Sequence, residues 1–158
     1  MDVLHHQSSV GQSWLRALTQ TVIPGISSGH RRPLPRLSDV HPGRPTSSRW
    51  VGLRAVPTEC IHGTASAAAD SRGQDFRPLV GREPADWRSR WSRLESGARN
   101  QAVLPPVQLV RAGGDYWVVD GHNRVALAME HGQAWIDADV TELDLSSENS
   151  AAVVAKEN

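Results

Sequence analysis

The chain has 158 residues, with 17 basic and 17 acidic side chains and no formal net charge. This length allows one domain with an ordinary core and excludes two full ones, and the balanced charge gives no overall reason to expect a nucleic-acid or membrane partner. The single cysteine, Cys60, excludes an internal disulfide, and neither a membrane-length apolar run nor a secretory signal is present, so we expect a cytoplasmic protein without a membrane partner.

The balanced total hides an uneven distribution of charge. Residues 1–50 carry six Arg against two Asp, residues 51–100 carry eight Arg against six acids, and residues 101–158 carry three basic side chains against nine acids. The basic front and the acidic end could attract each other, the front could meet a polyanion, or both could be solvated faces of opposite sign.

Residues 1–49 are expected to form an extension that is partly flexible. Trp14, Leu15, Leu18 and Val22 have helical spacing and predict one short helix near residues 11–21. Frequent Pro, Gly, Ser and Arg residues follow and exclude long elements. We expect the folded domain at residues 50–145 and a flexible tail at 146–158.

The first half of this domain predicts one strand, one loop and one helix. The strand runs from Trp50 to Ile61, with Pro57 placing it at a sheet edge or a strand end. His62-Gly63-Thr64 leaves the strand and leads into a loop over residues 65–81, which Phe76 and Leu79 should anchor to the core.

The helix is predicted from Pro84 to Ala98. Proline suits the first helical position, and one stripe of this helix, made of Trp87, Trp91 and Leu94, has the spacing of a buried face. Arg88, Arg90 and Arg93 should cover the remaining, solvated surface.

The second half predicts a hairpin, a helix and a final strand. Strands at residues 107–110 and 116–119 flank a turn at Gly113-Gly114-Asp115. A helix opens at Gly121 and is closed by Gly132, and a strand covers residues 134–143. The fold class that follows is α+β, a small mixed sheet with packed helices.

The turn between the second strand of the hairpin and the following helix is the candidate site, Asp120-Gly121-His122-Asn123-Arg124. The first amides of a helix lack intrahelical acceptors, and the helix dipole adds positive charge, so the turn is suited to a phosphate group. Gly121 lets a ligand approach the backbone, and the Arg124 guanidinium can grip phosphate oxygens. Asp120 could hold Mg²⁺ or accept a proton.

A purely structural interpretation is equally compatible with the spacing. Asp120 would then cap the helix, Gly121 would serve the turn, and Arg124 would pair with Asp137 or Asp139 on the surface. The additional polar side chains of His122 and Asn123 favour a binding site. No second ligand is spaced from His122 to hold zinc.

The segments Leu104-Pro105-Pro106-Val107 and Tyr116 through Ala126 resemble the ParB/sulfiredoxin superfamily, and most closely its bacterial branch with Asp-Gly-His-His/Thr-Arg at this turn. The resemblance extends upstream over about 90 residues, through Val56–Ile61, residues 75–78 and the Trp87/Trp91 helix. It implies a small α+β nucleotide-binding fold whose phosphates rest on the helix that starts at the motif.

Three groups of this superfamily differ at the turn. Partition proteins carry Gly-Glu-Arg-Arg and bind CTP. Gly121 and Arg124 match that motif whereas His122 and Asn123 do not, and the chain has no helix-turn-helix after the motif, so sequence-specific DNA binding is not expected. Sulfiredoxins carry a nucleophilic cysteine where His122 stands, so sulfiredoxin chemistry is not expected, and Cys60 is not assumed to replace it.

Free serine kinases of the same fold carry Asp-Gly-His-Thr-Arg, which differs only at Asn123. The resemblance implies that Asp120 and His122 are catalytic, and that Gly121, His122, Asn123 and Arg124 bind CTP or ATP, with Mg²⁺ held through the nucleotide. These kinases also need a glutamate after the first strand, and Glu59 is the nearest one here.

Three functions follow as hypotheses. The first is a Mg²⁺-dependent NTP hydrolase or phosphotransferase, and the second is a nucleotide-sensing or DNA-associated regulatory module without turnover. The third is a ParB-like nuclease, against which the acidic last third argues. The base, the turnover and the oligomeric state, including a homodimer, stay open at this point.

Overall fold

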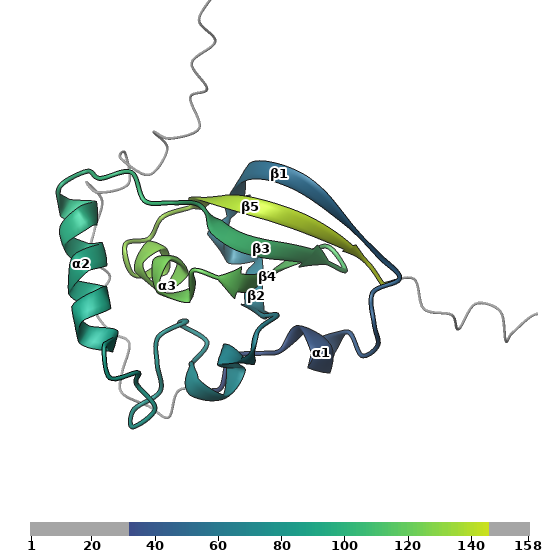
Figure 1. The fold of residues 1–158 in the computed structure, drawn as a ribbon, viewed down its shortest axis with the longest axis horizontal. Coiled ribbons are helices and arrows are strands. Elements are labelled where there is room, and N and C mark those ends of the chain that lie inside the picture. The colour runs from purple at the N-terminus through teal and green to yellow at the C-terminus, as the bar shows by residue number, and fades with distance from the viewer. Residues whose placement is uncertain (1–31, 146–158) are drawn as a thin grey trace, which may run out of the picture.

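The computed structural model describes residues 32–145 as a five-stranded mixed sheet accompanied by helices (Figure 1). The strands are β1 (Ser47–Pro57), β2 (Ile61–Thr64), β3 (Val107–Ala112), β4 (Asp115–Asp120) and β5 (Trp135–Asp144), in the spatial order β1-β5-β3-β4-β2. The helices are α1 (Leu37–Val40), α2 (Trp87–Arg99) and α3 (His122–Glu130). The predicted α+β class is confirmed.

The second half of the domain follows the predicted order of elements. β3 and β4 form an antiparallel hairpin around Gly113 and Gly114, whose φ angles of 62° and 97° suit only glycine easily. β5 then returns parallel to β3. Gly132, with φ of 63°, ends α3 as predicted, because its amide and that of Gln133 donate back to the carbonyls of the last helical turn.

The first predicted strand is in fact two strands at opposite edges of the sheet. β1 ends at Pro57, a short 3₁₀ turn covers Thr58–Cys60, and β2 begins at Ile61 and pairs in parallel with β4. The Thr58 amide and hydroxyl both donate to the segment before β5, at 3.0 and 2.5 Å. The alternating apolar pattern concealed this turn, because alternation does not report which strand a segment pairs with. Pro57 lies, as predicted, at the end of an edge strand.

Helix α2 begins three residues later than predicted, at Trp87 rather than Pro84, whose carbonyl accepts from the Trp87 amide at 2.9 Å. The prediction of a buried face is only partly met, because Trp87 and Trp91 are half-buried. The rings of Trp87 and Trp91 lie 4.9 Å apart, and the Arg77 guanidinium lies 4.5 Å from the centre of the Trp91 ring. The reason is that α2 packs beside α3 and not against the sheet (Figure 1).

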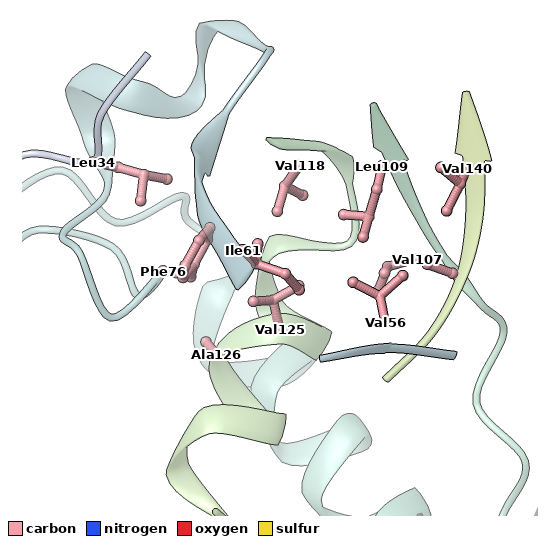
Figure 2. Close-up of a cluster of buried hydrophobic side chains, with 11 residues drawn as sticks. Leu34, Val56, Ile61, Phe76, Val107, Leu109, Val118, Val125, Ala126 and Val140 are labelled. Carbon is pink, nitrogen blue, oxygen red and sulfur yellow. The ribbon is translucent and has the colours of Figure 1, made fainter. Parts of the chain in front are cut away.

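The core lies between the sheet and α3 (Figure 2). Phe76 is buried as predicted, with a left-handed φ of 62°, whereas Leu79 is half-buried. Leu34 also belongs to the core, so packed structure begins earlier than the predicted domain start at residue 50. The helix predicted near residues 11–21 and the tail at 146–158 lie outside the described residues.

None of the helices between residues 32 and 145 combines the length and the apolar character that a membrane span requires.

Candidate functional site

The turn from β4 to α3 depends on glycine for structural reasons. Gly121 is the N-cap of α3 and has the left-handed angles φ 98° and ψ 23°. A Cβ atom added there would lie 2.7 Å from the Val107 side chain on β3. Backbone conformation and close packing against the sheet therefore both require glycine, without any appeal to a ligand.

The first turn of α3 presents two free amides. The backbone N–H groups of Arg124 and Val125 both donate to the Gly121 carbonyl, at 2.9 and 3.0 Å. Within residues 32–145 nothing accepts a hydrogen bond from the N–H groups of His122 and Asn123, and no side chain caps the helix. The alternative that Asp120 is the helix cap is therefore wrong, and the two amides keep the positive polarity of a helix start.

Arg124 is already engaged by the protein. Its Nη1 donates to the carbonyls of Pro105 and Pro106, at 2.6 and 2.7 Å, and its Nη2 donates to the Asp120 carboxylate at 2.8 Å. The structural interpretation proposed that Arg124 pairs with Asp137 or Asp139, and this is wrong, because neither carboxylate is among its partners. The guanidinium thus ties α3 to the segment that leads into β3, and of its five N–H groups two have no acceptor among the described residues.

His122 is buried, and its ring is hydrogen-bonded within the protein. Only 8% of its surface is exposed, and its Nε2 shares a hydrogen bond of 2.9 Å with the hydroxyl of Thr64, at the end of β2. Burial, together with the nearby positive charge of Arg72, lowers the pKa of His122 to about 4, while Asp120 acts in the opposite direction. The imidazole is therefore neutral at pH 7.

Asn123 connects the turn to an arginine that the sequence did not single out. Its side-chain oxygen accepts from Nη1 of Arg72 at 2.8 Å, and the same nitrogen donates to the Phe76 carbonyl at 2.6 Å. Both acceptors are neutral, and no described carboxylate pairs with Arg72. Burial, and to a smaller extent the charge of Arg90, lowers the pKa of the Arg72 guanidinium.

These side chains line an open cleft of about 370 Å³ at the start of α3. Four guanidinium groups and one carboxylate give this lining a net charge of +3 when His122 is neutral. The residues come from the loop before α2, from α2 itself and from the turn into α3: Arg72, Arg90, Arg93, Leu94, Asp120, Gly121, His122, Asn123 and Arg124. All five residues of the predicted site therefore meet at one cleft.

The sequence missed the far wall of this cleft. Arg90 and Arg93 were predicted to cover a solvated helix surface, and Arg72 was predicted only as part of a turn-like loop. Arg90, Arg93 and Leu94 have the i, i+3, i+4 spacing of one helix face. That spacing identifies a shared face, but only the packing of α2 beside α3 shows that the face is turned toward the motif.

Asp120 is the single carboxylate among the described residues that line the cleft. Within residues 32–145 no three His, Cys, Asp or Glu side chains gather closely enough to hold a metal ion by themselves. Since Mg²⁺ is usually bound by one or two carboxylates together with phosphate oxygens, the donor set fits Mg²⁺ delivered with a nucleotide. Cys60 and Glu59 lie in the turn between β1 and β2 and do not line the cleft.

Comparisons with known proteins give structural neighbours only. No protein-family model and no curated protein matches the sequence. Sulfiredoxin from Arabidopsis thaliana is 16% identical with a TM-score of 0.37, over 56% of this chain and 82% of that one. A Pnob8-like ParB-N domain is 16% identical with a TM-score of 0.38, over 67% of this chain and 34% of that one. The two names, sulfiredoxin and ParB-N domain, are those of groups that the sequence resemblance named.

Proposed function

We propose that the cleft at the start of α3 binds the phosphate groups of a nucleotide, CTP or ATP. The observation that carries this proposal is that His122 and Asn123, whose amides have no acceptor among residues 32–145, line a cleft with a net charge of +3. Amides at a helix start and guanidinium groups are the two donors that proteins use most for phosphate. The resemblance of the Asp120–Arg124 turn to nucleotide-binding members of the superfamily supports the choice of a nucleotide over other anions.

Each motif residue has a specific task in this proposal. The amides of His122 and Asn123 donate to phosphate oxygens, and the neutral imidazole of His122 keeps the first helical turn in place through Thr64. Arg124 offers its two unused N–H groups while its other donors hold Pro105 and Pro106. Asp120, exposed at the mouth of the cleft, would hold Mg²⁺ that arrives with the phosphates.

We also propose that the bound nucleotide is turned over, and that this reaction depends on Asp120. Phosphoryl transfer and hydrolysis need mostly charge neutralisation and positioning, which Mg²⁺ on Asp120 and the surrounding arginines would supply. His122 is buried with its Nε2 engaged by Thr64, whereas the Asp120 carboxylate is exposed, so Asp120 is the better candidate for orienting an attacking hydroxyl or water.

Thermal denaturation with a set of ligands tests the binding proposal. CTP or ATP in excess should raise the melting temperature, with a size set by the ratio of ligand concentration to Kd, whereas cytidine and adenosine without phosphates should not. No shift with any nucleotide, with or without Mg²⁺, would contradict the proposal.

Phosphate release then separates the enzyme from the binding module. An NTP hydrolase should release phosphate in Mg²⁺, and Asp120→Asn should abolish the release while nucleotide binding persists. Binding without any product would identify a nucleotide-sensing module, and cleavage of added DNA in place of nucleotide would favour the nuclease.

A further inference from the structure

The arginines on the far side of the cleft have no evident role in folding. Among residues 32–145, the Arg93 side chain donates hydrogen bonds only to Ser89 of its own helix, to the carbonyl at 3.2 Å and the hydroxyl at 3.5 Å. Arg90 pairs at 2.5 Å with Asp86, one turn earlier in the chain. Both side chains are mostly exposed, and exposed pairs of this kind contribute little to stability.

Their placement nevertheless has an electrostatic cost. Arg90 lies close enough to the partly buried Arg72 to lower the pKa of that guanidinium, and Arg72 has only neutral hydrogen-bond acceptors among the described residues. Asp86 offsets the charge of Arg90, but Arg72 and Arg93 have no carboxylate partner among the described residues, and gathered like charges destabilise the structure. A multivalent anion between these arginines would remove the repulsion.

We infer that Arg72, Arg90 and Arg93 form a subsite for the terminal phosphates of a nucleoside triphosphate, opposite the α3 amides. This inference rests on the proposed function and adds to it the residues that hold the outer phosphates. The phosphate nearest the sugar lies on the amides of His122 and Asn123, and the outer phosphates extend across the cleft toward α2. A net charge of +3 on the lining matches a triphosphate, which carries three to four negative charges, and exceeds what a monophosphate needs.

The arginines of this subsite differ in how firmly their side chains are held. Arg72 is fixed by hydrogen bonds to Asn123 and Phe76, so it stands between the two walls as a rigid donor. Within the described part of the chain, Arg90 and Arg93 bond only to Asp86 and Ser89, so their long side chains can turn toward an anion without breaking a bond to another element.

The matched comparison is between two double variants of α2. Arg90→Ala/Arg93→Ala removes the cleft-facing pair. Arg88→Ala/Arg99→Ala removes the same charge from positions that do not line the cleft. Titration calorimetry with CTP, CMP, ATP, AMP and inorganic tripolyphosphate, at constant low salt, gives the Kd for each protein.

The wild-type protein and the control variant should bind the preferred triphosphate at least about tenfold more tightly than the monophosphate. The Arg90→Ala/Arg93→Ala variant should lose at least about tenfold in triphosphate affinity and keep monophosphate affinity nearly unchanged, since each charge-assisted contact accounts for about a factor of ten. Equal affinity of wild type for mono- and triphosphate, or equal triphosphate binding by the two variants, would overturn the inference and leave the proposed function standing. Failure of every nucleotide and of tripolyphosphate to bind would overturn both.

Discussion

The two walls of the cleft are built in different ways. On the α3 wall each polar side chain is committed to the protein: His122 bonds to Thr64, Asn123 to Arg72, and Arg124 to Pro105, Pro106 and Asp120. On the α2 wall, Arg90 and Arg93 bond to no described residue other than Asp86 and Ser89, which lie on or beside their own helix. The motif residues on the α3 wall therefore hold the fold of this region together. Substitutions on the α3 wall should therefore change stability, and those on the α2 wall should change binding.

The largest effect is expected for Gly121→Ala on the α3 wall. The added Cβ meets the Val107 side chain at 2.7 Å and the backbone has a φ of 98°, so strain and overpacking together should cost about 4 kcal/mol. Gly114→Ala is the matched control, because its φ is 97° but no atom lies within 4 Å of the added Cβ, and it should cost only about 1 kcal/mol. Urea denaturation measures both, and equal losses would show that Val107 is not responsible.

A second effect concerns the pH dependence of the same wall. The pKa of His122 falls from 6.5 to about 4 on folding, so the unfolded chain binds more protons between these values. The free energy of unfolding should be highest above pH 6.5 and fall by on the order of 3 kcal/mol as the pH drops toward 4.

His122→Gln should flatten this part of the pH profile, and Thr64→Val, which leaves Nε2 without its partner, should lower stability at pH 7 by about 2 kcal/mol. Denaturant titrations in phosphate-free buffer from pH 4 to 7.5 provide the measurement. Parallel profiles for wild type and His122→Gln would contradict the assignment.

The smallest expected stability changes come from replacing one arginine on each wall of the cleft. Arg124→Ala leaves two proline carbonyls without a donor and should cost about 1–2 kcal/mol of stability, besides any loss of binding. Arg93→Ala removes only contacts within α2 and should change stability by less than about 0.5 kcal/mol. Thermal denaturation without ligand tests the pair, and a stability loss at Arg93 as large as that at Arg124 would remove the distinction between the walls.

The sequence predicted the half of the molecule whose contacts are local. The hairpin, α3 and β5 follow each other with short turns, so glycines at 113, 114, 121 and 132 and the apolar periodicity were sufficient. The same approach failed at Thr58–Cys60, because the choice between one strand and two depends on pairing with β4 and β5, which lie far along the chain.

The candidate site divides in the same way. The five residues of the turn are contiguous and were found from the sequence, whereas Arg72 joins them across 51 positions through Asn123. The hydrogen-bond partners of Arg124 could not be predicted from residue spacing either. They are the backbone carbonyls of Pro105 and Pro106, and residue type does not identify a backbone acceptor. Only the packed structure shows which arginines share a cleft.

The amide chemical shifts of His122 and Asn123 during a titration with CTP or ATP test the central claim most directly. If phosphate binds at the start of α3, these two signals should move and saturate with the ligand, because their N–H groups gain a charged acceptor, while those of Gly113 and Gly114 in the hairpin turn stay in place. Unchanged signals from His122 and Asn123 at ligand concentrations that saturate any other binding would contradict it.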